Sequence, residues 1–188
     1  ALIAGFLNEN PDMTMQTIEG DSTFVKELLT DGKCDIAFLR SESSSVKEFN
    51  SIPYMIDYLT AVLPVTHPLA KADNLPFEQL RGETFLLFPE HSFINDLCIR
   101  ECRNAGFEPH IAYTGNRGAT LIDLVRNGAG ITLMMHHSAR QENDSSLAFI
   151  PVTPGIYSYI SLNYAKEKPL SPQAESFVRY VKAHKRDF

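Results

Sequence analysis

The chain has 188 residues, of which 44% are apolar, and a formal net charge of −6 at pH 7. This length suffices for one large domain or two small lobes. The acidic balance argues against nucleic-acid binding by this chain alone, because phosphate contacts need a concentrated basic face. Apolar runs fall short of the roughly 20 residues of a membrane-spanning helix. Three cysteines without framework spacing favour free thiols in a reducing cytosol.

The first part of the chain predicts two helices and two strands. Residues 1–10 predict a helix ended by Pro11, and residues 13–18 mix polar and apolar side chains as a half-buried strand does. A turn then leads into an amphipathic helix that ends at Gly32, followed by a buried strand at 36–39. Because the chain begins within a helix, we expect a preceding strand, and a further domain, to be missing from it.

The rest of the chain alternates strand and helix patterns. Extended apolar runs predict strands at 52–65, 84–88, 108–113, 131–134, 148–152 and 157–164. Apolar stripes and caps predict helices at 75–80, 93–105 and 121–126, and a last helix opened by Ser171 and Pro172. Residues 141–146 predict a polar loop.

One supersecondary pattern occurs twice. An amphipathic helix, a glycine stop and a short buried strand occupy residues 25–38 and again residues 121–134. Each is half of a β-α-β unit, so we predict an α/β fold with two similar Rossmann-like lobes. Two lobes in one small chain leave a cleft between them, and such clefts bind small molecules.

Two short motifs, His67-Pro68-Leu69-Ala70 and Gly128-Ala129-Gly130-Ile131, follow each other at a characteristic distance. Weaker matches are Ile18-Glu19-Gly20, Asp35-Ile36-Ala37, Ala105-Gly106-Phe107 and Pro169-Leu170-Ser171-Pro172. Together these stretches, which extend over essentially the whole chain, resemble the effector-binding, or substrate-binding, domain of LysR-type transcriptional regulators.

The resemblance implies a fold like that of the type 2 periplasmic binding proteins, with two lobes joined by two crossover strands. Lobe I is expected at residues 1–60 and 156–188, and lobe II at 61–155. A small-molecule effector, such as an organic anion, would bind in the inter-lobe cleft. Full-length members carry an N-terminal winged helix-turn-helix that binds DNA, which is absent from this chain. The family also implies a homodimer, or a tetramer of the full-length protein, with the helix at 23–30 of one subunit near the helix at 93–105 of the other.

Three candidate effector contacts lie in lobe I. Ser22 and Thr23 stand at the start of a helix, where free amides and hydroxyls accept anions. Plain helix capping is the alternative there. Arg40 follows a buried strand at its carboxyl end, where ligands of open α/β sheets gather. A solvated surface arginine is the alternative for that position.

Five further candidates lie in lobe II. Asn116 and Arg117 precede its helix as counterparts of the first pair, and Arg117 could form a bidentate pair with a carboxylate or remain on the surface. Phe88 and Ser92 belong to the equivalent turn, and Thr132 lies on the following strand. Core packing is the alternative for the phenylalanine and the threonine.

Cys98 and Cys102 lie four residues apart on one predicted helix face, which raises the possibility of a redox switch. Peroxide sensors of the resembled family carry a reactive cysteine just after a histidine before this helix, and here Ser92 follows His91. Buried structural thiols are therefore preferred. Neighbouring His136 and His137 predict a partly exposed helix start rather than a metal site.

We therefore predict a cytoplasmic, ligand-sensing domain of a LysR-type regulator. No catalytic residue, metal, cofactor or membrane partner is expected, and DNA would be bound only through the missing N-terminal domain. One alternative is a periplasmic solute-binding receptor of a transporter with the same fold. Another is an enzyme on this fold, although the sequence has no Gly-x-Ser-x-Gly elbow, phosphate-binding glycine loop or zinc motif.

Overall fold

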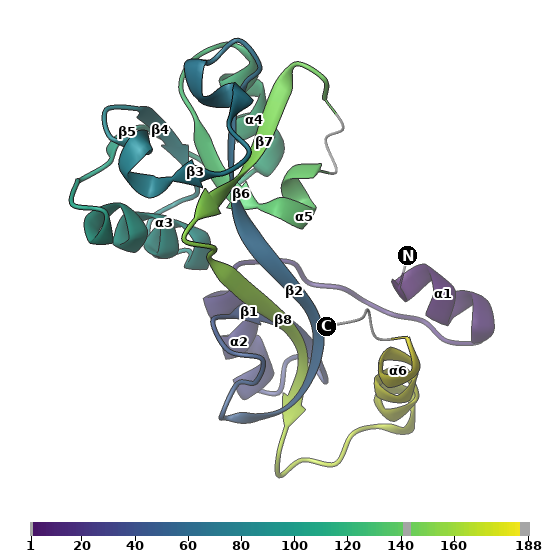
Figure 1. Cartoon of the computed structure of the whole chain (residues 1–188). Helices are drawn as coiled ribbons and strands as arrows, with labels where there is room; N and C mark the ends of the chain where they lie inside the picture. Colours follow the sequence, from purple (N-terminus) through teal and green to yellow (C-terminus); the bar gives the residue numbers. More distant parts are fainter. Residues whose placement is uncertain (1, 141–143, 185–188) are drawn as a thin grey trace. The chain divides into compact units, whose positions relative to one another are not determined.

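The computed structural model describes residues 2–140 and 144–184 (Figure 1). The chain forms two compact units, which are considered separately. Unit 1 takes the described residues up to Ile56 and from Ser158 onward, and unit 2 spans Asp57–Tyr157. None of the helices in these described ranges is long and apolar enough to cross a membrane.

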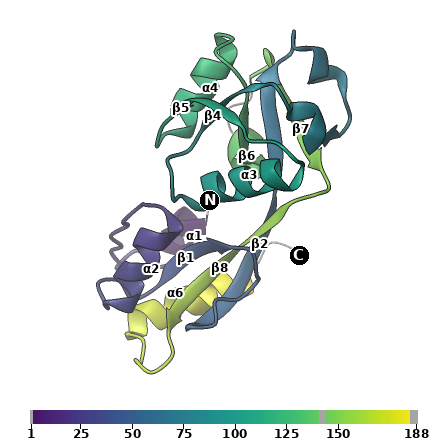
Figure 2. The ribbon, with the colours of Figure 1, turned by 90° about the vertical axis from the view of Figure 1, so that its left-hand side faces the viewer.

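Unit 1 is an antiparallel sheet packed with helices. Its elements are α1 (Leu2–Glu9), α2 (Ser22–Thr30), β1 (Ala37–Ser41), the first half of β2 (Phe49–Pro64), nearly all of β8 (Tyr157–Ala165) and α6 (Pro172–Ala183). Strand β1 pairs with β8, and β8 pairs with β2. Helices α1 and α6 lie side by side in Figures 1 and 2, and their Phe6 and Phe177 rings meet edge to face at 5.0 Å.

The strand predicted at 13–18 is wrong. These residues form no ladder with any described part of the chain. Met13 and Met15 pack partly buried against the core between α1 and α6, which accounts for the alternating pattern. A period of two reports which side chains are covered, whereas a strand also needs a hydrogen-bonding neighbour.

Unit 2 contains the second half of β2 and the whole middle of the chain. Its other elements are the 3₁₀ turns η1 (Pro68–Lys71) and η2 (Phe77–Leu80), the strands β3 (Leu75–Pro76), β4 (Thr84–Leu87), β5 (His110–Thr114), β6 (Thr132–Met135) and β7 (Leu147–Thr153), and the helices α3 (Phe93–Asn104), α4 (Gly118–Arg126) and α5 (His136–Ala139). Strand β2 pairs antiparallel with β6 and β7, and β3 pairs parallel with β7. Strands β4 and β5 form a separate parallel pair.

Strand β6 is covered on both faces, which explains its continuous apolar sequence. Leu133 and Met135 pack in the core that also holds Leu97 of α3. Met134 points the other way, into the core that holds Leu121 of α4. The helices predicted at 93–105 and 121–126 are thus confirmed as α3 and α4.

Two other expectations have different outcomes. The helix predicted at 75–80 is wrong in its first part, because Leu75 and Pro76 form β3 and only Phe77–Leu80 turn as η2. A residue before proline is pushed toward extended geometry, which keeps Leu75 out of a helix.

The loop predicted at 141–146 lies partly outside the described residues, since the structure resumes at Asp144.

The motif His67-Pro68-Leu69-Ala70 is explained by a cap. His67 Nδ1 accepts a hydrogen bond from the Leu69 amide at 3.2 Å, so the proton of the neutral ring stands on Nε2. That Nε2 lies 3.2 Å from a carboxylate oxygen of Glu83. The histidine therefore fixes the start of η1 to the segment that leads into β4.

The second motif is explained by a close backbone approach. The Ile131 amide donates to the Thr84 carbonyl at 2.8 Å, and the Leu86 amide donates to the Ile131 carbonyl at 2.9 Å. A Cβ atom on Gly130 would overlap that Thr84 carbonyl oxygen. Only glycine therefore lets the chain entering β6 run against β4.

We predict that Gly130→Ala lowers the free energy of unfolding by about 3 kcal/mol, because the overlap can be relieved only by separating β4 from β6. Gly128→Ala is the matched control. Gly128 has φ of 75° but no atom within 4 Å of an added Cβ, so its cost should be about 1 kcal/mol. Urea unfolding of both variants measures the difference, and equal losses would contradict this explanation.

Candidate functional site

A chain of polar contacts joins the start of α2 to β1 and β8 in unit 1. The Ser22 hydroxyl accepts a hydrogen bond from the Arg40 amide at 3.3 Å, and Arg40 Nη1 donates to the Ser158 hydroxyl at 2.6 Å. Ser158 is buried, while Ser22 and Arg40 are half-buried and Thr23 is exposed. The structure thus brings together Ser22 and Arg40, and Thr23 follows Ser22 on α2 with its side chain exposed. It also places Ser158 against Arg40. In the sequence, the one sign of this role is that Ser158 is a small polar residue within an apolar strand.

The amides at the start of α2 already contact a carboxylate. Asp21 Oδ1 accepts from the backbone N–H groups of Thr23 and Phe24 at 2.9 and 3.0 Å. Asp21 is therefore the N-cap of the helix, which leaves the Ser22 hydroxyl for Arg40. An anion arriving at this corner would meet the Asp21 charge before it reached the amides.

In unit 2, the turn before α3 is closed by Ser92. Its hydroxyl donates to the Pro89 carbonyl at 2.7 Å and accepts from the Asn95 amide at 3.3 Å. The Asn95 side chain, itself buried, donates to the Phe88 carbonyl at 2.8 Å. The Ser92 hydroxyl is thus engaged as a helix cap, and Asn95 is a polar contributor that sequence reasoning missed.

The start of α4 lies against Phe88. A Cβ on Gly118 would stand 2.9 Å from the Met134 methyl group and 3.8 Å from the Phe88 ring, so glycine allows this packing. Arg117 is the N-cap residue, without a side-chain capping bond within the described residues. Asn116 and Arg117 are both exposed. Within the described part of the chain, this helix start, unlike that of α2, has no carboxylate bonded to its amides.

Thr132 is fully buried on β6, opposite Val62 of β2. Its hydroxyl has no hydrogen-bond partner among the described residues. Thr60, two residues before Val62, is equally buried, but its hydroxyl lies 3.2 Å from His136 Nδ1. The Thr60 hydroxyl therefore has a hydrogen-bond partner, whereas the Thr132 hydroxyl has none among the described residues.

The histidine pair begins α5, as the sequence predicted. His136 stacks on Tyr58 with ring centroids 4.3 Å apart, and the His137 amide donates to Asp57 at 3.0 Å. Burial lowers the pKa of His136, and the charge of Arg140 lowers it further. No cluster of three metal-ligand side chains occurs within residues 2–140 and 144–184.

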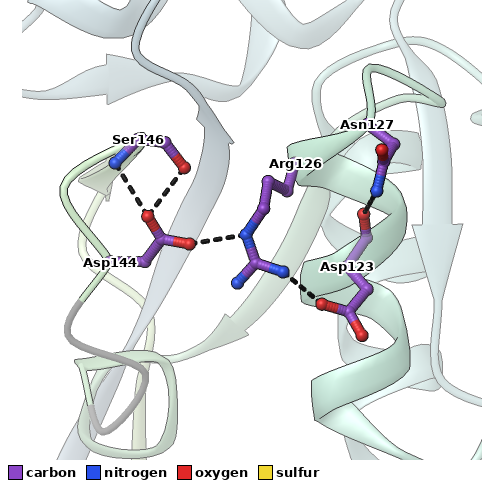
Figure 3. A network of polar contacts seen from close by, with 5 residues as sticks. All are labelled: Asp123, Arg126, Asn127, Asp144 and Ser146. Atoms are coloured by element: carbon purple, nitrogen blue, oxygen red, sulfur yellow. Dashed lines mark hydrogen bonds and ion pairs between the residues drawn. The ribbon is translucent and has the colours of Figure 1, made fainter.

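An ion-pair network ties the end of α4 to the segment before β7 (Figure 3). Arg126 contacts Asp123 and donates from Nε to Asp144 at 2.6 Å. Asp144 also accepts from the amide and hydroxyl of Ser146, at 2.8 and 2.7 Å. The Ser146 bonds, followed by Arg126, lower the pKa of Asp144 to about 2. Asp144 is consequently ionised at neutral pH, and the network has a structural role.

The thiols of α3 are buried and protonated at neutral pH. Burial raises the pKa of Cys98 well above its usual value and that of Cys102 to about 12. A thiolate is the reactive species, so neither thiol is poised as a nucleophile. The structural interpretation of these cysteines is supported.

We predict that Thr132→Val raises the free energy of unfolding by about 1 kcal/mol, because it removes a buried hydroxyl that has no partner. Thr60→Val should lower it by about 1 kcal/mol, since His136 Nδ1 would lose its contact. Thermal and urea unfolding measure both. A destabilised Thr132→Val variant would mean that the hydroxyl has a partner in solution.

The fold is similar to those of solved regulatory domains. The CcmR regulatory domain of Synechocystis PCC6803, in complex with 2-PG, matches with a TM-score of 0.89 and 16% identity, over 100% of this chain and 90% of that chain. The effector binding domain of QuiR, in complex with shikimate, matches with a TM-score of 0.80 and 19% identity, over 98% and 90%. At these identities the likeness shows the fold alone, and it confirms the predicted fold class.

The sequence is similar to those of curated regulators. It is 25% identical over 181 residues to the transcriptional dual regulator GltC of Bacillus subtilis (strain 168), covering 96% of this chain and 60% of that protein. It is 30% identical over 144 residues to the HTH-type transcriptional regulator TtuA of Agrobacterium vitis, covering 74% and 46%. This chain therefore spans about half to three fifths of their lengths. The model of the LysR substrate binding domain matches residues 1–186, and the chain belongs to this family.

Proposed function

We propose that this chain is the ligand-sensing part of a cytoplasmic, DNA-binding transcriptional regulator of the LysR type. The observation that carries the proposal is the family match over residues 1–186. The relatives are transcriptional regulators rather than enzymes or receptors, which disfavours both alternatives. DNA would be bound through an N-terminal domain outside this chain, because the chain itself is acidic.

We further propose that units 1 and 2 are the two lobes, divided near the predicted boundaries of 60/61 and 155/156, and that a small organic anion binds between them. In unit 1, Arg40 offers a positive charge on a guanidinium that donates to Ser158, while its backbone amide donates to Ser22. In unit 2, Arg117 offers another at the uncapped start of α4. The remaining proposed contacts are Thr23, Phe88, Ser92, Asn116 and Thr132. Effector binding would shift the population toward one lobe arrangement.

A thermal-shift screen of organic acids tests this function. We expect at least one stabiliser, because an occupied site adds about 2.7 kcal/mol at a hundredfold excess over the dissociation constant. Ser22→Ala and Thr23→Ala should reduce its effect. Thr30→Ala is the control, since Thr30 lies at the other end of α2 and its hydroxyl donates to the Lys26 carbonyl of the same helix. Stabilisers that are uncharged and indifferent to Ser22, Thr23, Arg40 and Arg117 would refute the anion site.

The Asp21 carboxylate gives a sharper test. Asp21→Asn should keep the helix cap, because asparagine caps about as well as aspartate. It should tighten binding of the stabilising anion roughly fivefold, since removing one screened like charge is worth up to about 1 kcal/mol. Asp31→Asn, the same charge change at the C-cap of α2, is the matched control. Calorimetric titration measures the anion affinity of both variants. An equal gain in affinity in the two would indicate only a general effect of net charge.

We also propose a homodimer in which α2 of one subunit lies near α3 of the other. Phe24 on α2 is 42% exposed, so it offers apolar surface to such an interface. Phe24→Asp should convert the dimer to monomers. Ile3→Asp, at a similarly exposed position on α1 (39%), should not. Sedimentation at high micromolar concentration measures the outcome, and a wild-type monomer, or a dimer that tolerates Phe24→Asp, would contradict this interface.

A further inference from the structure

A recess of about 390 Å³ lies in unit 1, between the end of β8, the segment that follows it, and α6. Charged side chains make up much of its lining: Lys166, Lys168, Arg179 and Lys182 are basic, and Glu167 and Glu175 are acidic. Four positive and two negative charges give the lining a formal charge of +2. The chain as a whole carries −6, so this recess stands out electrostatically.

The basic side chains of the recess are not neutralised by contact. Within the described residues, Lys168, Arg179 and Lys182 take part in no ion pair and no side-chain hydrogen bond. Lys166 Nζ donates to the Lys47 carbonyl at 2.6 Å, which anchors it without cancelling its charge. Two other lysines of unit 1 are paired, namely Lys26 with Glu48 and Lys33 with Asp31.

The recess has an apolar floor that belongs to the core of unit 1. Val178 of α6 is buried there, and Tyr164 and Leu170 pack partly buried against the same core. Asn50 Nδ2 donates to the Ala165 carbonyl at 3.3 Å and so holds the wall to β2. A cationic rim over an apolar floor suits an anion that carries a ring or a short chain.

This recess is separate from the contacts around Arg40. Ser158, which bonds Arg40, stands at the start of β8, whereas Ala165 stands at its end. Seven residues of extended strand separate them, or roughly 23 Å at about 3.3 Å per residue. The two groups also share no residue, so one ligand of ordinary metabolite size does not reach both.

We propose that the recess is a second binding site, which takes a small organic phosphate ester. Lysine ammonium groups bind phosphate as point charges, and arginine can grip two of its oxygens. A doubly charged phosphate group balances the +2 lining, and the volume falls within the range of small-molecule pockets. The site goes beyond the effector function and does not depend on it.

Titration of the ¹⁵N-labelled chain with phenyl phosphate, and separately with benzoate, tests the proposal by NMR. Phenyl phosphate should give saturable shifts at the amides of Lys166, Glu167, Lys168 and Leu170 and at those of α6 after Pro172, and benzoate should bind there far more weakly. Shifts at Ser22 and Thr23 report the effector site independently, so failure at one site does not decide the other. Shifts that grow linearly without saturating, or equal binding of benzoate, would overturn the proposal.

Charge variants complete the test. Lys168→Gln and Arg179→Gln should each weaken phenyl phosphate binding about fivefold, and Glu175→Gln should strengthen it, because each changes one screened charge at the rim. Lys71→Gln, an exposed lysine in unit 2, is the matched control and should leave the affinity unchanged. All four positions are exposed, so an unchanged melting temperature is expected. Equal losses in Lys71→Gln and Arg179→Gln would refute a defined site.

Discussion

Strand β2 is the constraint on which the rest of the structure depends. It runs for 16 residues and pairs with β6, β7 and β8, so each unit is built on part of it. Residues 59–63 are all buried, because helices or strands cover both faces there. Leu59, Ala61 and Leu63 fill one core of unit 2, and Val62 fills the other. A one-residue slip in the pairing of β2 would turn each of these side chains toward the opposite core. The alternation therefore fixes the register of β2.

Elements set by local signals could be predicted from the sequence, whereas the pairing partner of a segment could not. Helix α6 follows from Ser171, which caps it, and from Pro172 at its first position. Residues 13–18 show the limit, because a strand is defined by a neighbour that a single segment does not encode. At the candidate site, Ser22 and Arg40 stay predictions that rest on their places at helix and strand ends. Ser158 was not predictable, because its contact arises only from the pairing of β1 with β8.

The motifs that identify the family are structural in this chain. His67 caps a 3₁₀ turn, and Gly130 allows two strands to approach. Neither requirement depends on what the protein binds, so these residues can persist across regulators with different effectors. The proposed effector contacts Asn116 and Arg117 are by contrast exposed, and exposed loop positions tolerate variation. Family membership consequently specifies the scaffold far better than the effector.

The burial of two of the three cysteines has a practical consequence. Cys98 and Cys102 lie in the core of unit 2 with no exposed surface, whereas Cys34 is partly accessible in unit 1. Burial and the neighbouring Asp35 raise the pKa of Cys34, so its thiolate forms only under more alkaline conditions than a free thiol needs. A maleimide dye would then attach at one position, two residues after Gly32. The natural sequence thus carries a single-site handle for fluorescence spectroscopy without any engineered cysteine.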